Sequence, residues 1–192
     1  MSLRVMLVDR DPERAELLEQ ALAEAGHRVI GRIGDDAALA AQVAKHQPDV
    51  IIIDMEAPGR DTLEQMREIA RDRPKPIILF SDERDPAYIR QAVQAGVSAY
   101  VVDGLSQERV MPIVEVAVAR FREFQNLRQE LEDTKTQLAD RKIIEKAKGL
   151  LMKKKAMDED QAYQFLRKTA MSRNLQLIEV ARVLISLEET LT

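Results

Sequence analysis

The sequence predicts an α/β domain of five doubly wound strand–helix units, followed by a coiled-coil linker helix and a three-helix C-terminal domain. Three observations support this division. The chain has 192 residues, which is more than one ordinary domain needs. In its first half, short β-branched runs alternate with amphipathic segments, as in a parallel sheet covered by helices. Between Pro112 and about Lys155 there is no further proline, so one long helix can leave the first domain.

Five strands are predicted from the β-branched runs, and a flavodoxin-like strand order would place the first and third side by side. The strands are Arg4–Val8, Arg28–Ile33, Val50–Ile53, Ile77–Phe80 and Ala99–Val102. The helices between them are Pro12–Ala25, Asp35–His46, Thr62–Arg71 and Pro86–Ala95. Gly26 and Gly96 stand where two of these helices end, since glycine tolerates the left-handed backbone that closes a helix.

The long helix is expected to begin between Ser106 and Pro112 and to carry the seam of a coiled coil. Its apolar residues recur at spacings of three and four, although the regular stretch covers only about two heptads. The residues assigned to dimerisation are Phe124, Leu127, Leu131 and Leu138. We therefore expect a parallel homodimer, with a first domain at residues 1–120, a linker helix at 113–142 and a C-terminal domain at 135–192.

Two shorter helices complete the C-terminal domain. Asp158 and Gln161 have the spacing of a capping box, which predicts a helix over Glu159–Met171. A third helix is predicted over Leu175–Thr190. The apolar faces of both would pack against the end of the long helix and form a small core.

Composition excludes several classes of protein. The chain has no Cys and only two His, which excludes disulfides and thiolate metal sites and leaves little for any other metal site. No apolar run approaches the ~20 residues that span a bilayer, and the N-terminal run is too short for a signal peptide. We expect a soluble, cytoplasmic protein without a membrane partner.

Two carboxylates are predicted to meet at one edge of the sheet. Asp9 and Asp54 directly follow the first and third strands, and in a doubly wound sheet ligands collect at the carboxyl ends of such strands. A pair of this kind can bind a divalent cation and offer a nucleophile to a phosphoryl group. The alternative is that each aspartate merely caps the turn or helix that follows it.

The residues around these positions resemble the receiver domain of two-component response regulators, over roughly residues 3–120. The matching segments are Val8–Pro12, Pro48–Asp54 with Pro58 and Gly59 following, Ser81, and Ala95–Tyr100. The resemblance implies that Asp54 is the phosphate acceptor and that Asp9 belongs to the acidic pocket. It also implies that the Ser81 hydroxyl moves with the phosphoryl group on Asp54. Tyr100 would be the aromatic side chain that rotates on phosphorylation in the phosphorelay.

Two positions depart from the receiver pattern. Arg10 stands where the family has a second acid, and Asp103 stands where it has a lysine. A site that gains a guanidinium and loses a carboxylate binds Mg²⁺ poorly, and a phosphoryl group without the lysine lacks a counter-ion. Arg10 and Asp103 could instead form an ion pair of reversed polarity, while Asp11 could still replace the missing acid. We interpret the domain as a pseudo-receiver that is kept for its shape and surfaces. We assign no catalytic residue and do not expect the protein to be an enzyme.

The C-terminal part of the chain is basic while the rest is acidic. Eleven Lys and Arg against seven Asp and Glu give residues 141–192 a charge of +4, and residues 1–140 carry −8. An acidic body with a basic tail indicates nucleic-acid binding by the tail, although ordinary solvated lysines are the alternative. The candidate RNA-binding residues are Lys142, Lys146, Lys148, Lys153, Arg167, Lys168 and Arg173.

The same segment resembles the ANTAR domain of transcription antiterminators over about residues 135–192. The matching motifs are Ala147–Met152, Ala162–Lys168, Ala170–Asn174 and Leu177–Ala181. The resemblance implies a three-helix domain that binds paired stem-loops in a leader transcript. Together with a degenerate receiver, it is most similar to the nitrate-responsive antiterminators of nitrate assimilation, with the amidase-type regulator as the nearest relative. Both imply restraint by a small-molecule sensor protein.

Two other functions remain open at this stage. One is a phosphorylation-controlled response regulator that binds DNA, but the third helix carries only Arg182 as a cation where a recognition helix needs polar base-reading residues. The other is a protein-interaction module with an incidental basic tail. Within the RNA hypothesis, Lys148 and Arg173 are the residues we expect to read loop bases, because they flank the motif segments.

Overall fold

A computed structural model describes residues 2–34, 38–102 and 107–190 of the chain. The chain divides into two units, Met1–Gln125 and Asn126–Thr192, and the long helix α5 (Gln107–Lys155) contributes residues to both.

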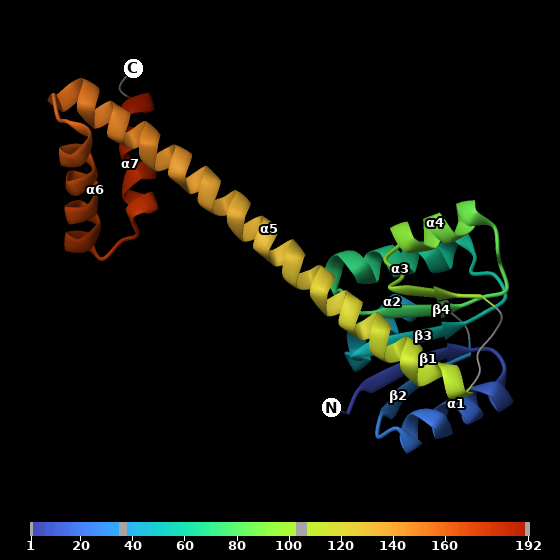
Figure 1. The fold of residues 1–192 in the computed structure, drawn as a ribbon. Coiled ribbons are helices and arrows are strands. Elements are labelled where there is room, and N and C mark those ends of the chain that lie inside the picture. The colour runs from blue at the N-terminus through green and yellow to red at the C-terminus, as the bar shows by residue number, and fades with distance from the viewer. Residues whose placement is uncertain (1, 35–37, 103–106, 191–192) are drawn as a thin grey trace. The chain divides into compact units, whose positions relative to one another are not determined.

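The first unit contains a five-stranded parallel sheet in the order β2-β1-β3-β4-β5 (Figure 1). Its strands are β1 (Arg4–Asp9), β2 (Arg28–Ile33), β3 (Val50–Asp54), β4 (Ile77–Phe80) and β5 (Ala99–Val101). The flavodoxin-like order expected from the sequence is confirmed. Strands β3 and β4 lie inside the sheet with both faces covered, which is why they are continuous apolar runs rather than alternating ones.

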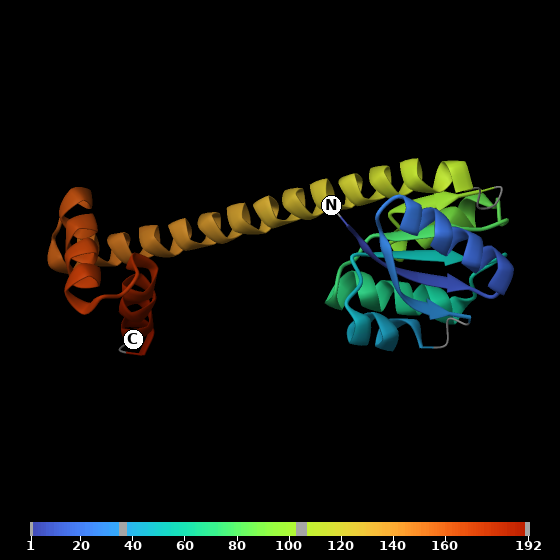
Figure 2. The same cartoon turned by 90° about the horizontal axis from the view of Figure 1, so that it is seen from below.

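Helices cover both faces of this sheet, and each face has its own core (Figure 2). Helix α1 (Pro12–Glu24) and the first turns of α5 pack on one face, through residues such as Leu18 and Val114. On the other face lie α2 (Leu39–His46), α3 (Arg60–Asp72) and α4 (Pro86–Gln94). The sequence predicted α3 to start two residues later, at Thr62, and α2 to start at Asp35, which lies outside the described residues.

The second unit combines the end of α5 with α6 (Glu159–Arg173) and α7 (Leu177–Thr190). The predicted capping box is present, because the Asp158 carboxylate accepts the Gln161 amide while the Gln161 side chain accepts the Asp158 amide. Ala147, Leu166 and Ala181 are fully buried at the centre of its core. None of the helices in the described part of the chain is both long and apolar enough to cross a membrane.

Gly96 closes helix α4 at a point where no other residue fits. Its φ of +101° lies in the left-handed region, and a Cβ built on it would stand 2.4 Å from the Cβ of Ala70 in α3. Gly26, after α1, has a similar φ of +79° but has nothing within 4 Å of a built Cβ. A side chain at Gly26 would therefore strain only the backbone, whereas a side chain at Gly96 would also collide with Ala70.

We predict that Gly96→Ala lowers the free energy of unfolding by about 2–4 kcal/mol, because it adds overpacking to left-handed strain. Gly26→Ala should cost only about 1–2 kcal/mol, from the backbone strain alone. Urea unfolding followed by circular dichroism measures both. Equal losses in the two variants would contradict the proposed contact between the α3 and α4 ends.

Candidate functional site

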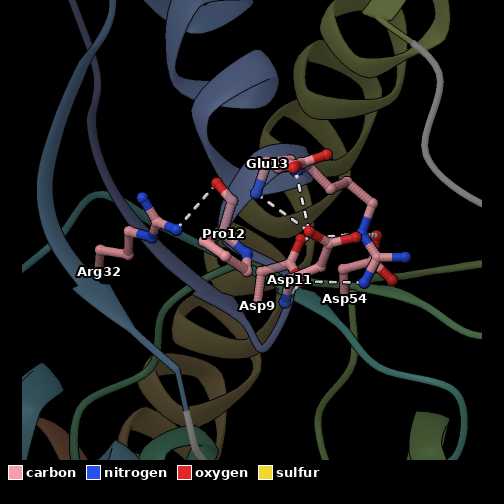
Figure 3. A network of polar contacts seen from close by, with 7 residues as sticks. Asp9, Asp11, Pro12, Glu13, Arg32 and Asp54 are labelled. Atoms are coloured by element: carbon pink, nitrogen blue, oxygen red, sulfur yellow. Dashed lines mark hydrogen bonds and ion pairs between the residues drawn. The ribbon is translucent and has the colours of Figure 1, made fainter.

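Two buried carboxylates face each other at the carboxyl edge of the sheet. Asp9 ends β1, Asp54 ends β3, and the two are direct partners in the register of these parallel strands. Asp9 is 2% exposed and Asp54 is 6% exposed. Figure 3 shows Asp9, Asp11 and Asp54 lying together at this edge. The strand ends thus bring together the pair that the sequence predicted.

The guanidinium of Arg14, in the first turn of α1, binds this pair. Its Nε and Nη2 donate to the two oxygens of Asp9 at 3.0 and 2.9 Å, and its Nε lies 3.2 Å from Oδ2 of Asp54. Arg14 was not among the site residues predicted from the sequence. A signal was available, because a cation in the first turn of a helix opposes the helix dipole and needs a local partner to offset this.

Asp11 holds the start of α1 in place. It is the N-cap residue, and its Oδ1 accepts the backbone amides of Glu13 and Arg14 while Pro12 occupies the first helical turn. Its own amide donates to Asp9 Oδ1 at 2.8 Å. Asp11 lines the pocket, but the carboxylate that was left open as a replacement acid is engaged in capping.

The pocket itself has a volume of about 570 Å³ and mixes both charges. Arg10, Asp11, Arg14 and Asp54 line it together with Glu56 and Asp82. The expected ion pair between Arg10 and Asp103 is not placed, since Asp103 lies outside the described residues. Arg14 supplies the bidentate contact to a pocket acid that had been expected of Arg10.

Burial raises the pKa of Asp54 to about 6. Arg14 opposes this increase, while the charges of Asp9 and Asp82 add to it. Oδ2 of Asp54 is buried without a hydrogen bond even though Arg14 Nε is 3.2 Å away, because the Nε–H is directed at Asp9 instead. The hydrogen bond to Asp9 in turn raises the pKa of Arg14. Arg14 therefore hydrogen-bonds both oxygens of Asp9 but meets Asp54 only as an ion pair.

Ser81 and Tyr100 bind the loops after β3 and β4 rather than the pocket. The buried Ser81 hydroxyl donates to the Glu56 carbonyl at 2.7 Å and accepts the Glu83 amide at 3.2 Å. The hydroxyl of the half-buried Tyr100 donates to the Glu83 carbonyl at 2.8 Å, and its ring packs edge-on against Tyr88. Neither Ser81 nor Tyr100 lines the pocket.

The residues of this pocket do not fit a divalent cation. Mg²⁺ requires oxygen ligands arranged around one centre at about 2.0–2.1 Å. Here the Arg14 guanidinium hydrogen-bonds both oxygens of Asp9 and stands 3.2 Å from Oδ2 of Asp54, so a cation already occupies the space between the two carboxylates. Across the described residues, no three His, Asp or Glu side chains are grouped to hold a metal ion.

In the second unit, several basic side chains are held within the fold. Lys148 is only 7% exposed and lies 2.9 Å from Glu145 and 2.7 Å from Glu159, so it joins α5 to the start of α6. Hydrogen bonds to these two glutamates raise the pKa of Lys148. Three other cations bind within the unit: Lys154 pairs with Glu188, Lys155 lies over the Phe165 ring and Arg182 pairs with Asp140.

The other predicted RNA-binding cations are exposed. Lys142, Lys146 and Lys153 lie on α5, while Arg167, Lys168 and Arg173 lie on α6. Arg167, Lys168 and Arg173 have no ion pair with the described carboxylates. Tyr163 and Met171 are also exposed and stand four residues before and after Arg167, so they share its side of α6. Neither residue was predicted from the sequence, although an aromatic residue one helical turn from a basic residue is a signal for stacking on bases.

The predicted seam of α5 is also exposed in the single chain. Leu127 and Leu131 are 55% and 53% exposed, and Phe124 and Leu138 are exposed to a similar degree. These four residues leave apolar surface in contact with water along one side of the helix.

Comparison with known proteins places each unit in a family. Residues 5–115 match the response regulator receiver domain, and residues 132–185 match the ANTAR domain. The signal receiver domain of the response regulator NarL from Mycobacterium tuberculosis superposes with a TM-score of 0.53 at 26% identity, covering 60% of this chain and 96% of that domain. The receiver and ANTAR resemblances seen in the sequence are confirmed.

One relative matches nearly the whole chain. The transcriptional regulatory protein PdtaR of Mycobacterium tuberculosis is 32% identical over 95% of this chain and 89% of its own length. The nitrate regulatory protein of Klebsiella oxytoca is 40% identical over 42% of this chain and 20% of that protein. The aliphatic amidase regulator of Pseudomonas aeruginosa is 27% identical over 58% of this chain and 57% of that protein. All three are regulators.

The raised pKa of Asp54 predicts a pH-dependent stability. Because the folded chain binds this proton more tightly than the unfolded chain, the contribution of Asp54 to the free energy of unfolding should fall as the pH rises from about 4 to about 6. Asp54→Asn removes the buried charge and should stabilise the chain at pH 7.5 by roughly 1–2 kcal/mol, with little effect at pH 4.

Urea unfolding at the two pH values measures this difference. Glu19→Gln, at an exposed carboxylate in the middle of α1, is the control and should change each value by less than about 0.5 kcal/mol. If Asp54→Asn destabilised the chain at pH 7.5, the Asp54 carboxylate would be stabilised by its surroundings and not penalised by burial.

Proposed function

Because this chain belongs to the family of regulators that join a response regulator receiver domain to an ANTAR domain, we propose that it controls transcription by binding RNA. The RNA is a leader transcript with paired stem-loops, and binding prevents termination. The chain performs this task in the cytoplasm, where transcripts are made.

The observation that carries this proposal is the division of the basic residues in the ANTAR unit. Lys148, Lys154, Lys155 and Arg182 are bound by neighbouring groups. Arg167, Lys168 and Arg173 point outward from α6 without a carboxylate partner among the described residues. Clustered cations that are not neutralised internally attract a phosphate backbone and release its counterions. The exposed side of α6 is therefore the centre of the proposed RNA face.

Sequence-specific contacts with RNA usually involve unpaired loop bases that stack on aromatic or guanidinium groups. Tyr163 and Arg167 offer both kinds of group one helical turn apart, and Arg173 stands at the end of the same helix. Lys142, Lys146 and Lys153 would add backbone contacts along α5. Lys148 could touch RNA only by leaving its two glutamates, so we assign it to holding α5 and α6 together.

We further propose that the chain acts as a parallel homodimer through Phe124, Leu127, Leu131 and Leu138. Packing these side chains against a second copy would remove their apolar surface from water. A dimer would present two ANTAR units to an RNA that carries two stem-loops.

The signal that we propose is a small molecule sensed by a separate protein, not a phosphoryl group. The pocket contacts of Arg14 oppose metal-dependent phosphorylation of Asp54, which leaves the surfaces of the receiver unit for a protein partner. Likeness to the nitrate regulatory protein supports control of nitrate or nitrite assimilation genes, and likeness to the amidase regulator supports a sensor partner.

The RNA face is tested with the triple variant Arg167→Ala/Lys168→Ala/Arg173→Ala. Its affinity for a two-hairpin leader RNA should fall at least tenfold, and each lost phosphate contact should reduce the salt slope of binding by about 0.7–0.9. Fluorescence anisotropy at several salt concentrations measures both. A DNA duplex of the same sequence should bind weakly, whereas preference for the duplex would favour the DNA-binding alternative.

The control for this experiment removes three exposed arginines from the receiver unit, as Arg67→Ala/Arg71→Ala/Arg90→Ala. It changes the net charge equally and should leave RNA affinity within about twofold. Equal losses in the two triple variants would show a general charge effect and would contradict the proposed face.

The dimer is tested with Leu127→Glu/Leu131→Glu, which places two buried charges in the proposed seam. Sedimentation velocity should show a monomer for this variant and a dimer for the wild type. Asn126→Glu/Gln129→Glu adds the same charge at exposed positions beside the seam and should remain dimeric. A dimer that persists in the leucine variant would rule out this seam as the interface.

A further inference from the structure

Arg14 lies between two strand ends and contacts a buried carboxylate on each of them. Its Nε lies 3.0 Å from Asp9 Oδ2 and 3.2 Å from Asp54 Oδ2, so one nitrogen bridges carboxylates from two neighbouring strands. Its Nη2 donates to the other oxygen of Asp9 at 2.9 Å. This is the fork geometry for which a guanidinium is suited and a lysine is not.

Asp9 accepts three hydrogen bonds, which engage both of its oxygens. Oδ1 accepts from Arg14 Nη2 and from the Asp11 amide, and Oδ2 accepts from Arg14 Nε. Asp54 contributes the oxygen that is buried without a hydrogen bond, Oδ2, and this oxygen faces the same guanidinium. A divalent cation held between the facing oxygens of Asp9 and Asp54 would occupy the position of the guanidinium. The guanidinium and the metal therefore exclude each other.

Local structure fixes Arg14 in this position. Its backbone amide donates to Asp11 Oδ1, its side chain binds Asp9, and the Asp11 amide also donates to Asp9. Both ends of the arginine are thus anchored to residues within five positions in sequence. The side chain is 40% exposed, so the guanidinium closes the pocket at its solvent side.

We propose that Arg14 is the resident cation of this pocket and that its contacts with Asp9 and Asp54 keep divalent metal out of the native chain. The pocket then works as a fixed ion-pair junction between β1, β3 and α1. Acidic residues at its rim, Asp82 and Glu56, add negative charge that a metal would meet once Arg14 is gone. The proposal does not depend on RNA binding.

The test is a titration of the full chain with MnCl₂, followed by the electron paramagnetic resonance signal of free Mn²⁺. The wild type should bind no Mn²⁺ at millimolar concentrations. Arg14→Ala should bind Mn²⁺ with a dissociation constant at least tenfold below the highest concentration tested. Arg67→Ala, which also removes a half-exposed arginine from an ion pair, should behave like the wild type. Arg14→Ala/Asp54→Asn should lose the gained binding, because it lacks one of the two ligands.

Two outcomes would overturn the proposal. One is wild-type binding as tight as that of Arg14→Ala, and the other is a folded Arg14→Ala variant that gains no Mn²⁺ affinity. If Arg14→Ala does not fold, the wild type provides the test through the NMR signal of the Arg14 Nε–H, identified by its loss in Arg14→Lys. This signal should stay unchanged when 10 mM MgCl₂ is added, and a shift or loss of the signal would contradict the proposal.

Discussion

The ion-pair junction of Arg14 with Asp9 and Asp54 is the constraint on which the first unit depends. Parallel strands in register bring the two carboxylates together at the edge of the sheet, where burial penalises their charge. One guanidinium hydrogen-bonds both oxygens of Asp9 but only approaches Asp54, so it offsets just part of the burial that raises the pKa of Asp54. The start of α1 is built around the same contact, since Asp11 both caps the helix and donates its amide to Asp9.

An analogous arrangement organises the second unit with the charges reversed. There one ammonium, that of the nearly buried Lys148, is held by Glu145 on its own helix and by Glu159 at the start of α6. The capping box of Asp158 and Gln161 fixes the beginning of α6 beside it. These contacts assist a small core that would be marginal alone. The basic residues of this segment therefore fall into two groups. One group is bound within the fold, and the other projects from α6.

The division of the basic residues suggests separate tasks for the two units. In our proposal, the receiver unit supplies a rigid body whose pocket is neutralised from within, so that regulation acts through its surfaces. The ANTAR unit provides the exposed cations that bind RNA, and the exposed apolar side of α5 binds a second copy of the chain. The family match supports this arrangement, since the regulator PdtaR matches this chain over nearly its whole length.

Local patterns in the sequence determined the five strands, the α6 capping box, the glycine at the end of α4 and both domain families, because each follows from residues close together in the chain. The meeting of Asp9 and Asp54 was also predictable, since strand order places their ends side by side. The choice of Arg14 as their counter-ion and the burial of Lys148 were decided by the tertiary structure. Several arginines and lysines have suitable spacing in the sequence, and only the three-dimensional position of strand ends and helix starts determines which one reaches a buried carboxylate.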